Sequence, residues 1–141
     1  MINFFAEDVD FPLLNESLVT KWLSAVCKAE NKALEEVSII FCSDEYLLDM
    51  NNEYLQHDYY TDIITFDYCV DNQIVGDLFV SVDRIKENSM LNAVTFDNEL
   101  LRVMVHGVLH LIGFKDKTDE DSKLMRQKED EYLNLYVPRE T

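Results

Sequence analysis

Apolar and polar residues alternate along several short stretches of the chain, and this alternation is typical of β-strands. Residues 61–68 follow a period of two, and the alternation resumes over residues 73–82 after a turn at Asp71-Asn72. These two stretches predict an antiparallel hairpin. Apolar runs at residues 2–6 and 37–42 predict two further strands. The run at 37–42 is β-branched and apolar throughout, as in a strand buried on both faces.

Between these strands the apolar positions recur every three to four residues, which predicts helices. The first helix extends from an Asn15 cap to about residue 31. Its expected buried face carries Leu18, Trp22, Val26 and Ala29. We therefore expect Trp22 to be a core residue.

Two shorter helices are predicted in the middle of the chain. Ser43 caps a helix that ends near residue 55 and is expected to bury Leu47, Leu48 and Tyr54. A second short helix covers about residues 83–91.

Two longer helices are predicted in the last third. Thr95 or Asp97 caps the first of them, and Thr118 caps the last, which ends near residue 136. The charges at 119–131 are interpreted as a solvated face. The order β-α-β-α-β-β-α-α-α predicts an α+β fold of one domain over residues 1–141, with a small sheet and helices packed on it.

Composition and charge narrow the class of protein. The chain has 141 residues, a net charge of −16 and three cysteines without CxxC spacing. An odd, scattered set of cysteines argues against a disulfide framework and favours the cytoplasm. The first ten residues lack the basic segment of a signal peptide, and no apolar run reaches membrane-spanning length. We expect a cytoplasmic protein that does not bind membranes.

Candidate chemistry lies in residues 101–117, LRVMVHGVLHLIGFKDK. His106 and His110 are four positions apart, so on a helix both imidazoles share one face and can reach one ion. Gly113 can end the helix, because glycine tolerates the required backbone conformation, and Asp116 can then return a carboxylate to the same ion. Two nitrogens, one oxygen and an open fourth position predict a catalytic zinc site, although nickel or manganese also suit these donors.

Two observations qualify this interpretation. An HxxxH pair can arise by chance, with both rings satisfied by hydrogen bonds, but the apolar surroundings here make unpaired imidazoles costly. Metalloproteases of the HExxH type carry their general base directly after the first histidine, and here that position is Gly107. Peptide hydrolysis is therefore disfavoured.

The segment HGVLHLIGF, which begins at His106, resembles the H-G-x-L-H-L-x-G-[YF] signature of the YbeY family of metal-dependent endoribonucleases. Residues 51–66, NNEYLQHDYYTDIITF, resemble a second family motif, N-x-x-Y-R-x-x-D-x-x-T-D-V-L-S-F, and residues 76–78 resemble its G-D-I. Two positions depart from the family. Asp116 stands where a third histidine is common, and Leu55 replaces the motif arginine.

The resemblance implies a mixed four-stranded sheet, with the strand at 61–68 beside the metal cleft. It also implies a single-strand-specific endoribonuclease that acts in 3′-end maturation of 16S ribosomal RNA and in ribosome quality control. The implied partners are ribosomal RNA and the small ribosomal subunit. We consider His57 and Asp62 as catalytic residues. His57 could transfer a proton or contact phosphate, and Asp62 could orient a ligand histidine or cap a strand end.

The charge of −16 stands against tight binding of naked nucleic acid, because phosphate contacts usually require a basic surface. We therefore expect weak binding, unless a local basic patch or a partner presents the RNA. Two other functions stay open at this point: another metal-dependent hydrolase, such as a peptidase, and a ribosome-assembly factor with a structural metal.

Overall fold

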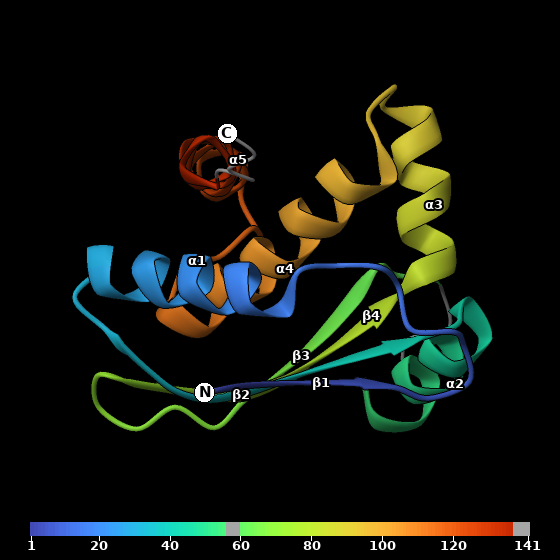
Figure 1. Cartoon of the computed structure of the whole chain (residues 1–141), viewed down its shortest axis with the longest axis horizontal. Helices are drawn as coiled ribbons and strands as arrows, with labels where there is room; N and C mark the ends of the chain where they lie inside the picture. Colours follow the sequence, from blue (N-terminus) through green and yellow to red (C-terminus); the bar gives the residue numbers. More distant parts are fainter. Residues whose placement is uncertain (56–59, 137–141) are drawn as a thin grey trace.

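The structure is a computed structural model that describes residues 1–55 and 60–136. Its elements in chain order are β1 (Ile2–Ala6), α1 (Glu16–Ala29), β2 (Ala33–Cys42), α2 (Asp44–Leu55), β3 (Ile63–Asp67), β4 (Gln73–Ser81), α3 (Val82–Leu91), α4 (Phe96–Ile112) and α5 (Asp119–Leu135). Helices α1 and α4 lie on one side of the sheet, and α2 lies near one end of it (Figure 1). The predicted α+β class is confirmed.

The four strands form one mixed sheet in the order β1-β2-β4-β3. β1, β2 and β4 are parallel, and β3 runs antiparallel to β4. The predicted hairpin is therefore confirmed, with Ile63 opposite Val80 and Asp67 opposite Gly76. The hairpin places β3 at the sheet edge, where its residues can face a cleft.

Four of the five helices in the described residues begin where their caps were predicted; the exception, α3, begins after Ser81, which the sequence analysis did not identify as a cap. Each capping side chain accepts a hydrogen bond from the backbone N–H three residues later, which satisfies one of the unpaired donors of the first turn. The four caps are Asn15, Ser43, Thr95 and Thr118. Of the two residues considered for α4, the cap is Thr95.

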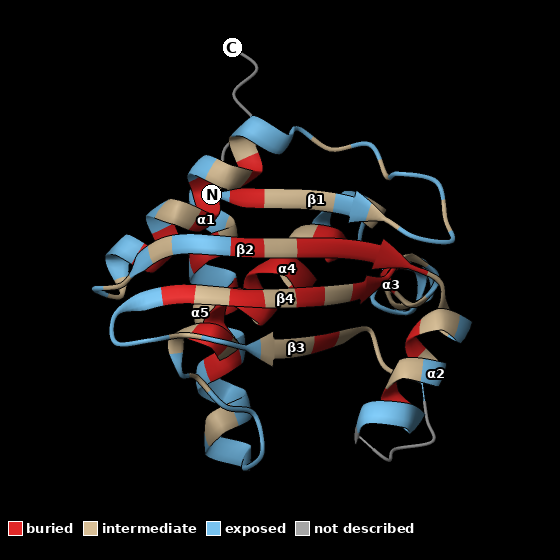
Figure 2. Ribbon diagram, turned by 90° about the horizontal axis from the view of Figure 1, so that it is seen from below, coloured by how far each residue is buried: buried red, intermediate tan, exposed pale blue. Residues whose placement is uncertain are grey.

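The core lies between the sheet and α1, α4 and α5. β2 and β4 occupy the centre of the sheet, and much of both strands is buried (Figure 2). The Trp22 indole donates to the Tyr132 carbonyl at 2.7 Å, which ties α1 to α5. Trp22 is a buried core residue, as expected.

Two expected buried positions are wrong. Ala29 is exposed, because the buried face of α1 is rotated toward Val19, Leu23 and Cys27. Tyr54 is 63% exposed, because it lies in the last turn of α2, where its ring makes an edge contact with Phe66 of the sheet at 6.4 Å between ring centroids.

Two further features of the described residues are the state of the cysteines and the lack of a membrane-spanning helix. Cys27 and Cys42 are buried and Cys69 is partly buried, and all three are free thiols. Among the described residues, no helix combines the length and the apolar character needed to cross a membrane.

Candidate metal centre

Helix α4 carries His106 and His110 on the same side, one turn apart. Their ring centroids are 4.6 Å apart, and both side chains are about one-quarter exposed. The rest of the helix is mostly buried apolar surface. The two imidazoles therefore project from a rigid, packed helix toward solvent.

The turn after α4 brings Asp116 to these rings. Gly113 has a φ of 127°, and its N–H and that of Phe114 donate back to carbonyls of the last turn. This positive φ requires glycine, as the sequence suggested. The chain reverses there, and Asp116 lies beside both histidines.

The three predicted ligand atoms converge on one point. Oδ2 of Asp116 lies 3.5 Å from Nε2 of His106 and 3.4 Å from Nε2 of His110. A tetrahedral ion with bonds of about 2.0–2.2 Å places its ligand atoms about 3.3–3.6 Å apart. The observed separations fit such an ion, so the three residues could hold a metal.

The other nitrogen of each ring is already engaged. Nδ1 of His110 lies 3.0 Å from the Phe114 carbonyl, so it carries the proton and donates there. Nδ1 of His106 lies 2.6 Å from the Glu129 carboxylate and donates likewise. These two contacts orient the rings and leave Nε2 of each ring on the side of Asp116, where it could bind an ion.

Glu129 was missed by the sequence analysis, which placed it on a solvated face of α5. It is only 4% exposed, and Arg102 donates to its second oxygen at 2.9 Å. Burial alone would raise the pKa of Glu129, but the hydrogen bonds from His106 and Arg102 hold that pKa below its ordinary value. The sequence did contain an indication that Glu129 is buried, because on a helix it shares a face with the apolar residues Met125 and Tyr132, which are buried.

An open cleft of about 670 Å³ adjoins the metal centre. Its lining combines polar and apolar side chains of α2, of β3 and the residues just before it, and of the turn after α4 with both histidines: Asn51, Thr61, Asp62, Ile63, Ile64, Thr65, Asp67, His106, His110, Asp116 and Lys117. The strand at 61–68 thus lies beside the cleft, as the resemblance implied.

The two predicted catalytic residues have different outcomes. Asp62 lines the cleft, and burial raises its pKa, although the nearby His106 opposes this rise. The carboxylate that orients His106 is nevertheless that of Glu129. His57 falls outside the described residues.

Gly107, the residue after the first histidine, is closely packed against the sheet. A Cβ at this position would lie 2.7 Å from Ile63 Cδ1 and 2.9 Å from Leu78 Cδ1. The position faces Ile63 of β3 and Leu78 of β4 at close range, so a larger side chain would have to displace the ends of these two side chains. Close packing against the sheet therefore favours glycine at the position that carries the base in HExxH proteins.

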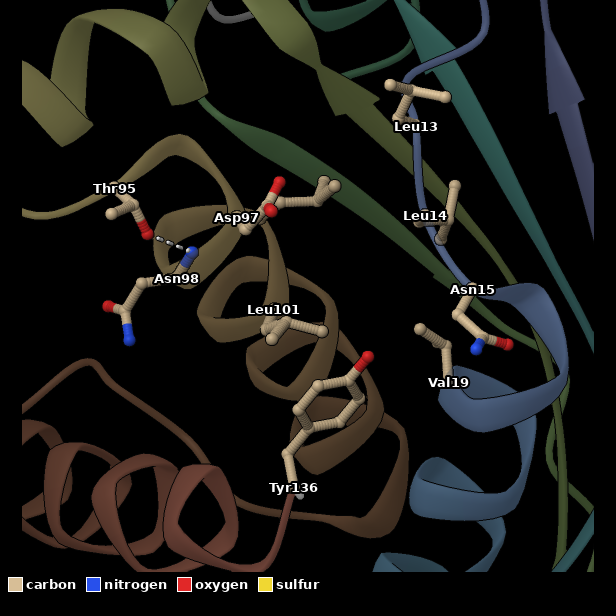
Figure 3. Close-up of a pocket in the computed structure, with 10 residues that line it drawn as sticks. Leu13, Leu14, Asn15, Val19, Thr95, Asp97, Asn98, Leu101 and Tyr136 are labelled. Carbon is tan, nitrogen blue, oxygen red and sulfur yellow. Dashed lines mark hydrogen bonds between the residues drawn. The ribbon is translucent and has the colours of Figure 1, made fainter. Parts of the chain in front are cut away.

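A separate apolar cavity of about 420 Å³ lies near the N-terminal ends of α1 and α4. Leu13, Leu14, Val19 and Leu101 project into it, and Tyr136 projects from the end of α5 (Figure 3). Among the described residues, it shares no lining with the metal cleft. It takes no part in the metal centre.

Comparison with known proteins agrees with the resemblance. The family model for Endoribonuclease YbeY matches residues 2–137. The Endoribonuclease YbeY of Flavobacterium johnsoniae is 53% identical over 136 residues, covering 96% of this chain and 97% of the relative. That of Cytophaga hutchinsonii is 50% identical over 135 residues, covering 95% and 94%.

A solved structure has the same fold. The solution structure of TM1509 from Thermotoga maritima superposes with a TM-score of 0.67 at 28% identity, covering 95% of this chain and 87% of that one. The match to the family model, the identity to these relatives and the shared fold lead to one conclusion: the chain belongs to the Endoribonuclease YbeY family.

Proposed function

We propose that the protein is a zinc-dependent endoribonuclease that hydrolyses phosphodiester bonds of single-stranded RNA with a metal-activated water. The relatives from Flavobacterium johnsoniae and Cytophaga hutchinsonii are both named endoribonucleases, and this chain matches nearly the whole length of each. The name supports the reaction class. The choice of zinc and of single strands rests on the donor set and on the sequence motifs.

The observation that carries the proposal is the convergence of two imidazole nitrogens and one carboxylate oxygen at the wall of an open cleft. His106, His110 and Asp116 supply these atoms. Three protein donors are typical of catalytic zinc sites, whereas structural sites use four. Among the residues that the structure describes, the grouping found contains three ligands.

Zinc held there would lower the pKa of a water molecule and offset charge on a phosphoryl oxygen. The chain would contribute proton transfer and positioning. Asp62 lies in the cleft and has a raised pKa, so it suits a group that takes up the proton of the attacking water. His57 remains a second candidate for this role. Lys117 also lines the cleft and could meet a substrate phosphate.

We extend the proposal to 3′-end maturation of 16S ribosomal RNA and to ribosome quality control, in the cytoplasm and on the small ribosomal subunit. The net charge of −16 supports presentation of the RNA by a partner rather than capture of free strands. Binding to naked RNA should accordingly be weak at physiological salt. Nanomolar affinity measured by fluorescence anisotropy would contradict this expectation.

The experiment that tests the reaction class compares three substrates. Zinc-loaded protein is incubated with a single-stranded RNA, with the same sequence as a duplex, and with a peptide mixture, and His110→Ala is treated identically. We expect cleavage of the single strand by the wild type alone. Peptide cleavage without RNA cleavage would favour a peptidase. A protein that retains zinc and cleaves neither substrate would favour an assembly factor.

A further inference from the structure

The metal centre has a second, smaller cavity on its α5 side. This cavity measures about 200 Å³, and its lining comprises His106, Asp116, Ser122, Met125, Arg126 and Glu129. His106 and Asp116 also line the large cleft, so the metal centre lies between the two spaces. By liquid-water volume the small cavity has room for roughly half a dozen waters, which suits a small anionic group.

Arg126 is the positively charged residue that lines this small cavity, and its guanidinium has N–H donors available for a ligand. Its side chain is 60% exposed, and its ion pair in the described part of the chain is a long contact of 3.7 Å to Glu129. The two oxygens of Glu129 are already engaged at short range, by Arg102 at 2.9 Å and by His106 at 2.6 Å. Arg126 is therefore not required to neutralise or hydrogen-bond the Glu129 carboxylate.

The charge balance of the cavity favours an anion once an ion is bound. Among the residues that line the cavity, the two carboxylates Asp116 and Glu129 face one guanidinium, that of Arg126, while Arg102 outside the lining pairs with both Glu129 and Asp130. A divalent ion at the metal centre would then leave a net charge of about +1 on the lining. The chain as a whole carries −16, so such a local cationic site is where a phosphate would be held.

We infer that the small cavity is a phosphate subsite, in which Arg126 binds the RNA phosphate next to the one that is cleaved. The inference rests on the proposed function, because it places the scissile phosphate at the metal centre between the two spaces. Arg126 contributes a planar fork of N–H donors that matches two phosphate oxygens, and a lysine would supply only a point charge. The strand would continue into the large cleft on the opposite side.

The chain offers a matched control on the same helix. Lys123 is an exposed cation of α5 that lines neither the small cavity nor the large cleft. Lys123→Gln and Arg126→Gln therefore remove the same charge from the same helix, and only the second removes it from the cavity. Arg126→Lys retains the charge and loses the fork.

The test measures binding, not only cleavage. Zinc-loaded wild type and the three variants are titrated against a fluorescent single-stranded DNA oligomer over a range of salt concentrations, and RNA cleavage is measured in parallel. We expect Arg126→Gln to bind about three- to tenfold more weakly and to reduce the slope of log K against log salt by about 0.7, the loss of one phosphate contact. The affinity and salt slope of Arg126→Lys should lie between those of the wild type and of Arg126→Gln. Those of Lys123→Gln should match the wild type.

An Arg126→Gln variant with unchanged affinity and salt slope would overturn the subsite, as would a wild type that does not bind the oligomer even at low salt. Equal losses in Arg126→Gln and Lys123→Gln would overturn it too, because the effect would then be general charge. Zinc content is measured for each variant, and a loss of zinc that explains the weaker binding counts against the subsite. If wild-type protein binds the oligomer and cleaves no RNA, the proposed function fails, and the Arg126 comparison still decides the subsite.

Discussion

Nδ1 of His106 lies 2.6 Å from the carboxylate of Glu129, although the two residues belong to different helices. The contact joins α4 to α5 at the metal centre, and Arg102 supports it from the side by donating to the same carboxylate at 2.9 Å. The ring of His106 is therefore held in one tautomer and one orientation before any ion binds. Pre-orientation of this kind increases metal affinity.

We predict that Glu129→Ala lowers zinc affinity by about 10- to 100-fold, because His106 loses the group that orients it. Glu129→Gln should lose less, since its amide oxygen can still accept from Nδ1. The measurement is competition against a chromophoric zinc chelator. Glu131→Ala, an exposed carboxylate of the same helix, is the control. Wild-type affinity in Glu129→Ala would show that the ring is oriented by other contacts.

Gly113 supports a second prediction, about the turn after α4. Its φ of 127° is unfavourable for any residue with a Cβ, although there is open space around the position. Gly113→Ala should therefore lower the free energy of unfolding by about 1–3 kcal/mol in urea titrations. It should also weaken zinc binding, because the same turn positions the Phe114 carbonyl and Asp116. Lys115→Ala, in the same turn, should change neither quantity.

The features that could be predicted from the sequence are those that depend on residues close together in the chain. The helix caps and the spacing of His106, His110, Gly113 and Asp116 lie within short segments, so the geometry of one helix and of the turn after it brings these residues together. Whereas the mixed four-stranded sheet was implied only by the family resemblance, the pairing of β3 with β4 followed from periodicity and a short turn. These parts of the fold and of the candidate site were predictable because they depend on neighbours in sequence.

The features that sequence analysis missed depend on how the helices pack. Glu129 is brought to His106 by the docking of α5 on α4, which no local pattern determines, although a charged residue on the apolar Met125–Tyr132 face was a usable signal. To predict that Gly107 faces the sheet, one would likewise need to know where the sheet lies relative to α4. Tyr54 had the expected helical spacing but lies in the last turn of its helix, where contact with the sheet is slight.

A third prediction concerns pH and the contact between α1 and α5. Glu30 accepts hydrogen bonds from the Tyr132 hydroxyl and from Lys128. Burial raises the pKa of Glu30, but these partners outweigh it and hold the pKa below the ordinary value of 4.5. A lowered folded-state pKa contributes stability above the unfolded-state pKa, and this stability is lost as the pH falls through the folded-state value.

Glu30→Gln should therefore cost about 1 kcal/mol at pH 7, and the difference from wild type should shrink below about pH 4.5. Urea unfolding of both proteins at several pH values gives this difference, and titrations elsewhere in the chain cancel in it. A difference in unfolding free energy that stays constant down to pH 3.5 would mean that the negative charge of Glu30 does not contribute to the stability of this contact.

The last prediction concerns Asp116, the position at which this chain departs from the third histidine common in the family. Its side chain is 44% exposed, and its Oδ2 lies about equally far from both Nε2 atoms. The backbone there is held independently, because Ser122 Oγ donates to the Asp116 carbonyl at 3.1 Å. A substitution of the side chain should thus leave the turn in place.

We predict that Asp116→Ala loses most of its zinc on dialysis, whereas Asp116→His retains about one ion per chain, because imidazole replaces the carboxylate as a third donor. Elemental analysis after dialysis gives the zinc content, and urea unfolding of the metal-free proteins checks that the fold is intact. Lys117→Ala, next along the chain, should keep its zinc. If Asp116→Ala keeps full zinc, the third ligand is another group, and Asp119→Ala and Glu120→Ala would be examined next. Loss of zinc from Asp116→His, with the fold intact, would mean that the turn is shaped for a carboxylate and cannot bring an imidazole nitrogen to the same point.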